Sequence, residues 1–419
     1  MKFLIILVIF NKFCSNTISF TFTKKKINSV NIELLTEIFI GTPLQKIPSI
    51  LSFNTYSIYI PDNSFIIGKF NQLDSKTLIP NIYKNIPKNC SFEGNSIPCS
   101  TAKDIGSVIN NYESNELFTI YFILLTNSSN NSYNFNYALL GLKNKPYSSD
   151  IKTHLIWVMK TNSLIDNYVF TIKYKNNNEG ELIIGNYPHE YNSNYKEENL
   201  RFVEGKVIND GWSMKFSNIY SENFKSDINI GQFSLSIEGI IGSNDYIKYI
   251  NETFFNNLIE KNICKIQIIK DNRNNIFYQY ICNKHLRIKE FKKLIFENKN
   301  LNYSFEFEPQ NLFLYENNNY YSLILFSNQN LNTWILGEIF VKKYQLIFEP
   351  NESSIGIYLK KEKLYIFYII IIILTIFIFL LSFFLNKQLI LKKRKLRVNE
   401  LDENVDYIPK KDYKKINNN

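Results

Sequence analysis

The sequence predicts an all-β body in two halves, followed by one transmembrane helix. Aromatic residues make up 16% of the 419 residues, with 28 tyrosines and 34 phenylalanines but only 14 glycines. This composition favours a β-rich globular body over a disordered chain. The length allows two domains of usual size, each with its own core. Near the end of the chain, Leu364–Leu385 is an apolar run without a charge, long enough to span a bilayer.

The N-terminus has the layout of a secretory signal peptide. Lys2 precedes an uncharged apolar run from Phe3 to Phe10, and polar and small residues follow to about Phe20. The apolar run is too short to span a bilayer. We therefore expect residues 1–20 to be removed as a signal peptide; the alternative is a buried first strand.

Three short strands are predicted between residues 38 and 62. Two apolar runs, Ile38–Ile40 and Ile50–Phe53, flank the turn signal Gly41-Thr42-Pro43, and a third run, Tyr56–Ile60, follows at once. The sequence Ile-Gly-Thr-Pro from Ile40, a glutamine two residues after the proline, and Ile-Tyr-Ile-Pro ending at residue 61 closely resemble the opening of pepsin-like aspartic proteases.

The resemblance continues along nearly the whole body. The matching segments, in the family's order, are Tyr137–Leu142, Glu179–Gly185, Gly211–Phe216, Trp334–Glu338, Ile339–Phe348 and Ile355–Ile357. A hydrophobic-hydrophobic-Gly element occurs in each half, around Gly141 and Gly337, and glycine there lets two backbones approach closely. The resemblance implies a bilobal pepsin-like fold with an inter-lobe cleft: an N-terminal lobe at 21–190, a connection at 191–205 and a C-terminal lobe at 206–360.

The resemblance also implies where the first catalytic aspartate would lie. Aligned without gaps from Gly41, the family's Asp-Thr-Gly falls on Ser52, Phe53 and Asn54. An aspartic protease needs two carboxylates about 3 Å apart that share one proton. The first of the two is therefore absent from its expected position.

The second half does not supply an acid at the corresponding position either. Keeping the family's glycine on Gly239 places the missing aspartate at Ile237, and a slip of one residue places it at Ser236. Glu238 is adjacent, but neighbours on an extended strand point to opposite faces. Asp245 lies further on, at the start of a predicted helix. We expect Ser52 and Ile237 (or Ser236) to face one another across the cleft with no acid pair between them.

The hairpin that closes the cleft in this family carries a tyrosine before Gly-x-Gly. The best match, anchored on Gly106, places Lys103 at this flap position and makes residues 62–102 a long insertion. Asp104 at the rim of the cleft is a poor replacement acid because no partner carboxylate is identifiable.

Other chemistries find no support in the sequence. It has no Gly-x-Ser-x-Gly elbow, no phosphate-binding glycine loop and no metal-ligand spacing, so we expect neither metal nor cofactor. The three histidines, His154, His189 and His285, are scattered, and we interpret each as structural. Ser52 is a hydroxyl without an identifiable base, which favours a loop residue hydrogen-bonded to its own backbone.

Cysteines and sequons fit a secreted body. Cys14 would leave with the signal peptide, and the remaining four cysteines allow three pairings. One bridge per lobe, as the resemblance implies, favours Cys90–Cys99 and Cys264–Cys282. Sequons that can carry N-linked glycans occur at Asn89, Asn127, Asn130, Asn251, Asn302 and Asn351.

A basic segment follows the predicted span. The tail, 386–419, holds 10 Lys and Arg against 5 Asp and Glu, which is half of the net charge of +10. Its cluster Lys392–Lys395 beside the helix at 364–385 predicts a cytoplasmic tail and a luminal or extracellular body, and it favours anionic lipid over nucleic acid as a contact. The predicted location is a membrane of the secretory pathway or the cell surface, with a monomeric body.

Three functions remain open. The first is a membrane-anchored pseudoprotease that binds a polypeptide or protein partner through its cleft or surface without cutting it. The second is an active aspartic endopeptidase with displaced acids. The third is a structural or adhesive ectodomain. We favour the first because both acid positions are replaced.

Overall fold

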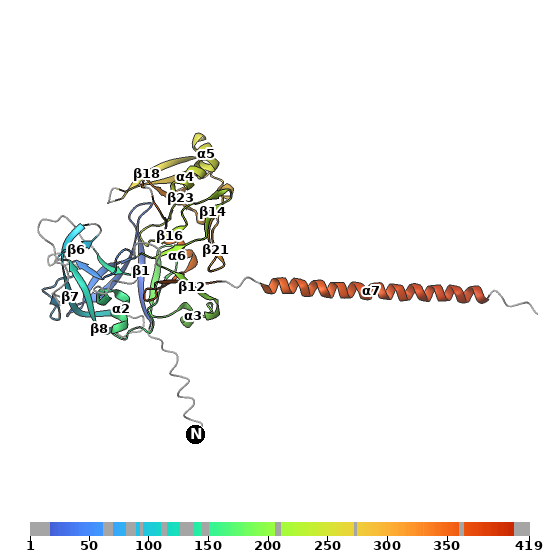
Figure 1. The fold of residues 1–419 in the computed structure, drawn as a ribbon, viewed down its shortest axis with the longest axis horizontal. Helices are drawn as coiled ribbons and strands as arrows, with labels where there is room; N and C mark the ends of the chain where they lie inside the picture. The colour runs from blue at the N-terminus through green and yellow to red at the C-terminus, as the bar shows by residue number, and fades with distance from the viewer. Residues whose placement is uncertain are drawn as a thin grey trace, which may run out of the picture. The chain divides into compact units, whose positions relative to one another are not determined.

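Figure 1 shows a computed structural model of the chain. It describes residues 17–61, 70–80, 89–92, 95–109, 115–125, 137–144, 151–205, 211–271, 275–329, 331–359 and 364–405. The chain divides into two units, Met1–Leu359 and Lys360–Asn419. Most of the first unit's described elements are strands, which confirms the predicted all-β body, and the second contains one long helix.

The N-terminal half winds one sheet through the order β1-β2-β3-β9-β4-β8-β7-β5. Its centre has a distinctive pairing, because β3 runs parallel to β9, β9 antiparallel to β4, and β4 parallel to β8. The elements of this half are β1 (Ile18–Lys26), β2 (Ile32–Ile40), β3 (Gln45–Ser52), β4 (Tyr59–Pro61), β5 (Ile79–Pro80), β6 (Asn89–Phe92), β7 (Asn95–Ile109), β8 (Asn115–Leu125), β9 (Ala138–Gly141), α2 (Leu155–Thr161), β10 (Phe170–Tyr174), β11 (Glu179–Ile184) and α3 (Pro188–Tyr191).

The C-terminal half repeats that centre. Here β16 runs parallel to β24, β24 antiparallel to β17, and β17 parallel to β23, so the two halves share one topology, as the internal duplication predicted. The elements of this half are β12 (Leu200–Glu204), β13 (Ser213–Lys215), β14 (Asn218–Ser221), β15 (Phe224–Lys225), β16 (Ile230–Phe233), β17 (Ile240–Ile241), α4 (Asn244–Ile250), α5 (Asn256–Glu260), β18 (Cys264–Lys270), β19 (Ile276–Asn283), β20 (Leu294–Asn298), β21 (Tyr303–Phe307), β22 (Phe313–Glu316), β23 (Asn319–Ser327), β24 (Trp334–Leu336), α6 (Glu338–Tyr344), β25 (Ile347–Glu349) and β26 (Ser354–Tyr358).

A shared sheet joins the halves in the order β12-β26-β25-β10-β11-β1. Strand β10 of the first half pairs with β25 of the second, where Phe170 lies opposite Phe348 and stacks on it with ring centroids 5.1 Å apart. Phe53, from the loop after β3, packs edge-on against both rings. Strand β12 lies in the predicted connection, 191–205, and is part of this sheet. The aromatic contacts tie the loop after β3 to the shared sheet.

The first strand begins before the predicted end of the signal peptide. Ile18 and Phe20 are buried and pair with Ile184 and Leu182 of β11. Removal of residues 1–20 would therefore delete three paired residues, so the structure favours a boundary before Thr17. Residues 1–16, with Cys14, lie outside the described residues, and the signal peptide stays a prediction.

The second unit contains α7 (Leu364–Val405). Within it, Ile369–Lys395 is long and apolar enough to cross a membrane, which agrees with the predicted span at 364–385. The helix does not end at the basic cluster but continues through it to Val405.

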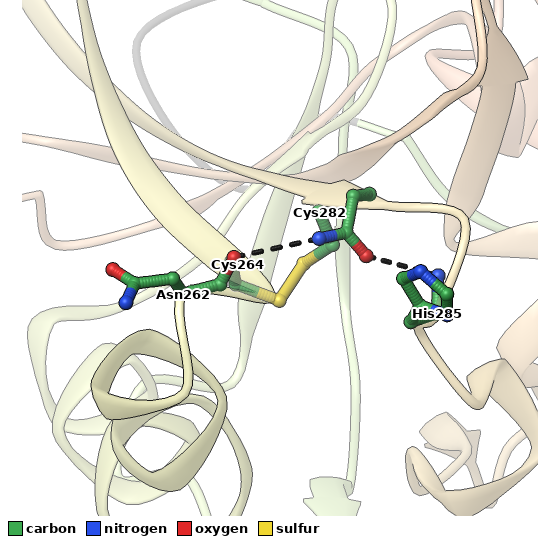
Figure 2. Close-up of a disulfide and its surroundings, with 5 residues drawn as sticks. Asn262, Cys264, Cys282 and His285 are labelled. Carbon is green, nitrogen blue, oxygen red and sulfur yellow. Dashed lines mark hydrogen bonds between the residues drawn. A yellow bond between two sulfur atoms is a disulfide. The ribbon is translucent and has the colours of Figure 1, made fainter.

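The disulfide predicted for the C-terminal half is present. Cys264 of β18 and Cys282 of β19 lie opposite each other and are bonded, between Asn262 and His285 along the chain (Figure 2). Cys99 is also disulfide-bonded. The side chain of Cys90 lies outside the described residues, so the pairing Cys90–Cys99 stays a prediction.

The sequons differ in accessibility. Asn302 and Asn351 are exposed, whereas the side-chain oxygen of Asn251 accepts a hydrogen bond from Tyr280 Oη at 2.6 Å. Asn127, Asn130 and the side chain of Asn89 lie outside the described residues. The exposed positions of Asn302 and Asn351 would leave room for a glycan.

Candidate functional site

The loop after β3 uses Ser52 locally. The Ser52 hydroxyl accepts a hydrogen bond from Asn54 N at 3.2 Å, and the Ser52 carbonyl accepts one from Leu142 N at 2.8 Å. Gly141 is required beside it, because an added Cβ would lie 2.4 Å from the Tyr56 carbonyl. The hydroxyl therefore caps its own turn, as the sequence indicated.

The loop after β16 has the same backbone arrangement. The Ile237 carbonyl accepts a hydrogen bond from Glu338 N at 2.8 Å, so this loop is also bonded to the residue that follows a close-approach glycine. An added Cβ on Gly239 would lie 2.0 Å from the Leu323 oxygen, and one on Gly337 would lie 2.1 Å from the Gly239 oxygen. The strand registers make Ser234 the counterpart of Ser52, which corrects the predicted Ile237 (or Ser236). Tyr59 pairs with Leu139, and Ile241 pairs with Ile335 at the same distance before the glycine, so the offset between the halves carries Ser52 onto Ser234. The Ser234 hydroxyl accepts a hydrogen bond from Ser236 N at 3.3 Å, as the Ser52 hydroxyl does from Asn54 N. Anchoring the family's glycine on Gly239 shifted the alignment by three residues.

Ile237 lies in an apolar cluster. The residues buried together there are Val30, Ile237, Ile241, Ile269, Phe277 and Leu325. The turn between β1 and β2 holds the loop in place, since Glu238 N donates to Val30 O at 2.9 Å and Ile32 N donates to Ser236 O at 3.0 Å. Ser236 itself is exposed, and its hydroxyl contacts that of Ser234 at 3.0 Å. An ionised carboxylate at position 237 would be surrounded by hydrocarbon.

Two carboxylates do meet beneath this loop, but a lysine lies between them. Lys24 Nζ is 3.0 Å from Glu238 Oε1 and 2.9 Å from Glu338 Oε2, and all three side chains are buried. Burial raises the pKa of Glu338, and Lys24 opposes this shift. Burial alone would lower the pKa of Lys24, but the two carboxylates outweigh it and the pKa is raised. The ammonium holds both acids as an ion-paired trio, a different arrangement from two carboxylates that share a proton.

The sequence did not indicate this trio, because its members are far apart in the chain. Glu238 was set aside as pointing away from the cleft, and its side chain indeed contacts Lys24 of β1. Asp245, the other nearby acid, is exposed in the first turn of α4. The signal that could have found the trio is the run of three lysines ending at Lys26, which is unusual in an otherwise half-buried strand.

Lys103 is not at a hairpin tip, which corrects the predicted flap position. It lies in the middle of β7, opposite Tyr121 of β8 and Ile79 of β5, with its ammonium 5.8 Å from the Tyr121 ring centre. The anchor on Gly106 was misleading because β7 continues as a strand through that glycine. The start of β7 pairs instead with β6, from Asn89 opposite Pro98 to Phe92 opposite Asn95.

Asp104 has a structural role. Its carboxylate is buried and accepts hydrogen bonds from Ser75 Oγ at 2.8 Å, Thr77 Oγ1 at 2.5 Å and Ile105 N at 2.8 Å. It therefore fastens the segment at 70–80 to β7. Its partners are hydroxyls and an amide, which agrees with the expectation that it is a poor replacement acid.

The contacts of His154 and His189 agree with a structural interpretation of these histidines. His154 caps α2 through Nδ1, which accepts from Ile156 N at 3.2 Å, and Nε2 lies 3.0 Å from Lys143 O. Complete burial lowers the pKa of His154 to about 4. His189 Nδ1 lies 2.6 Å from Tyr358 Oη. Within the described residues, no three His, Cys, Asp or Glu side chains gather as a metal site.

A groove opens beside the second loop. It has a volume of about 510 Å³ and is lined by Glu238, by the turn after β1 and by β18, β19, β22 and β23. Residues of both predicted lobes thus contribute to its walls.

Comparison with known proteins agrees with this architecture. The family model described as eukaryotic aspartyl protease matches residues 118–359, more than half of the chain. No curated protein matches the chain. The match covers the second loop, both glycines of the hydrophobic-hydrophobic-Gly elements and the closing strands. The chain therefore belongs to the eukaryotic aspartyl protease family.

Proposed function

We propose that this family member is a membrane-anchored pseudoprotease, which binds a polypeptide without cutting it. The observation that carries the proposal is the equivalence of Ser52 and Ser234. Each hydroxyl accepts a hydrogen bond from the amide two residues further on, at 3.2 Å and 3.3 Å, and neither residue carries an acid. General acid and base catalysis of peptide hydrolysis by this family's chemistry needs a carboxylate at both positions.

The nearby acids do not provide a substitute dyad. Glu238 and Glu338 each bind Lys24, so each negative charge already has a buried cation within about 3 Å. A carboxylate pair that shares a proton has no such cation between its members. This geometry argues against an active enzyme with displaced acids.

Retention of the fold favours a binding function over a structural or adhesive ectodomain. Glycines and main-chain hydrogen bonds preserve the crossing of both loops, and an open groove of about 510 Å³ remains beside the second one. Strand edges near such a groove can hold an extended chain by main-chain hydrogen bonds. We therefore favour a polypeptide partner over a purely adhesive role.

The test uses the full-length chain in phosphatidylcholine nanodiscs, with fluorescent β-casein as an unstructured probe. We expect binding without hydrolysis between about pH 3 and pH 7, where paired carboxylates operate. The variant Ser52→Asp should also be inactive, because a lone carboxylate has no partner. Turnover of β-casein that a statine-type inhibitor blocks would reject the proposal and establish the active enzyme. Absence of both binding and turnover would favour the adhesive ectodomain.

The proposed orientation places the body in the lumen or outside the cell, with the basic tail in the cytosol. The apolar helix at Ile369–Lys395 and the cluster Lys392–Lys395 support it. Protease added to sealed vesicles that carry the cytosolic face outwards should remove an epitope at the C-terminus and spare the body. Digestion of the body in the same vesicles would contradict this topology.

A further inference from the structure

The outer edge of β18 carries free main-chain groups. Among the described strands, β18 is the last of its sheet and pairs with β19 alone (Figure 1). Asn283 N donates to Ile263 O at 2.9 Å just before the strand, which fixes the odd-numbered residues as the hydrogen-bonded partners of β19. Because these pairs alternate in an antiparallel ribbon, the N–H and C=O groups of Ile266 and Ile268 point to the open edge.

The side chains along this edge are apolar in the middle and basic at the ends. Ile266 is 43% exposed and Ile268 is 61% exposed. Lys265 and Lys270 are exposed beside them. Lysines of this kind discourage pairing between identical edges, since an antiparallel second copy would bring four positive charges together. The same lysines complement a partner strand that has acidic ends.

The groove lies directly beside this edge. Its walls include Ile27 and Asn28 from the turn after β1, Gln267 and Ile268 from β18, and Tyr321 from β23. A volume of about 510 Å³ is within the range of binding sites for small ligands and short peptide segments. An extended chain along β18 would therefore also contact the turn after β1.

A buried acceptor in the groove lacks a donor. Gln279 is 1% exposed and lines the groove, and its Nε2 donates to Ser322 O at 2.9 Å. No donor from the described residues reaches its Oε1. A buried acceptor without a partner is unfavourable, and a hydroxyl side chain of an occupant, on the groove face of the sheet, would satisfy it.

We propose that an extended segment of a partner polypeptide adds to the free edge of β18 and occupies this groove. Its main chain bonds to Ile266 and Ile268, alternate apolar side chains cover the exposed isoleucines, and acidic residues at its ends meet Lys265 and Lys270. This inference rests on the proposed polypeptide-binding function and names the place and the class of segment that binds.

The test measures fluorescence anisotropy with the full-length chain in phosphatidylcholine nanodiscs. The probe is a fluorescein-labelled heptapeptide, Asp-Val-Thr-Val-Thr-Val-Asp. We expect saturable binding, at least tenfold weaker when both end residues are lysine. A peptide N-methylated at all three valines has the same charge but lacks the edge-pairing N–H groups, and it should also bind at least tenfold more weakly. Equal binding of the N-methylated peptide would reject edge pairing.

Matched variants locate the site. Ile268→Pro removes an N–H that β19 does not use, so it should preserve the fold and abolish binding, whereas Ile268→Val should bind within twofold of the wild type. Gln279→Met should weaken binding about fivefold, the effect of one hydrogen bond. Unchanged binding to Ile268→Pro would overturn the proposal. If Ile268→Pro unfolds, the binding of the N-methylated peptide to the wild type decides whether a peptide pairs with the edge of β18.

The same variant separates this inference from the proposed function. If Ile268→Pro still binds β-casein without cutting it, while the acidic heptapeptide binds it as well as the wild type, the β18 site is rejected and the pseudoprotease stands. Cleavage of β-casein by the wild type rejects the pseudoprotease, whatever the heptapeptide does.

Discussion

The loops after β3 and β16 have equivalent backbones but different side-chain environments. In the first, Ser52 is half-buried and its hydroxyl caps the turn, while Phe53 packs on the shared sheet. In the second, Ile237 lies in an apolar cluster and Glu238 is ion-paired to Lys24. The comparison shows that close-approach glycines and main-chain bonds build the same strand arrangement around loops with different side chains, so the fold does not depend on what the loops carry.

Alanine substitutions at Gly141 and Gly337, where two backbones approach closely, should have the largest effect on stability. Gly337→Ala would place a Cβ 2.1 Å from the Gly239 oxygen, and Gly141→Ala would place one 2.4 Å from the Tyr56 oxygen. Backbone cannot move aside as a side chain can, so we expect each to reduce the free energy of unfolding by about 4 to 5 kcal/mol or to prevent folding. Urea denaturation followed by tryptophan fluorescence measures the loss.

Gly211→Ala is the matched control, because its Cβ would meet only the flexible end of Gln232, at 3.0 Å. It should be nearly neutral. If only one of Gly141→Ala and Gly337→Ala is tolerated, the two halves do not depend equally on the close approach of their backbones.

Removal of the lysine should affect the second loop strongly. Lys24→Met leaves Glu338 buried without its ion pair and leaves Glu238 with Lys26 alone, at 3.7 Å, and we expect a loss of about 3 to 4 kcal/mol in the free energy of unfolding at pH 7. Lys25→Met, which removes an exposed pair with Glu33 and an exposed hydrogen bond to Tyr137, should change it by less than about 1 kcal/mol. Similar losses for both variants would mean that the trio contributes no more than a surface pair.

A carboxylate introduced into each loop should reveal their different surroundings. Ile237→Asp puts a charge into the apolar cluster and should lower the free energy of unfolding by about 2 to 3 kcal/mol at pH 7. Ser52→Asp, in a half-buried turn, should change it by less than about 1 kcal/mol because an aspartate can accept the same amide bond. Thermal unfolding of the two variants compares them, and equal losses would show that the two environments are alike.

The smallest expected effect is a pH dependence from Glu338. Its pKa is raised by burial, so the native state binds this proton more tightly than the unfolded chain does. The stability that it contributes is present below the usual glutamate pKa and is lost as pH rises through the native value. The free energy of unfolding of the wild type relative to Glu338→Gln should therefore decrease from pH 4 to pH 7. The opposite slope would show that Lys24 outweighs burial in setting the pKa of Glu338.

Much of the fold follows from local patterns. Gly141 and Gly337 were expected at close approaches, and each has backbone within 2.4 Å of its added Cβ. The Cys264–Cys282 bridge and the local role of Ser52 were likewise predicted, because both depend on residues that are near in sequence or on the family's order.

Other features depend on contacts that a single sequence does not reveal. Lys24 meets Glu238 and Glu338 across 214 and 314 residues, and no spacing rule connects them. Lys103 was misplaced because Gly106 resembles a turn signal, although β7 continues through it for 15 residues in all. The strand that begins at Ile18 was hidden because its apolar start is continuous with the predicted signal peptide.

The length of α7 determines how its charges are presented. A helix of 42 residues is about 63 Å long, roughly twice the thickness of the hydrocarbon core. Successive residues turn by about 100°, so the four consecutive basic residues from Lys392 to Lys395 point in every direction around the axis. This ring of positive charge would fix the depth of the helix in the membrane. It would not fix the rotation of the helix about its own axis, because all orientations present the same charge to the lipid headgroups.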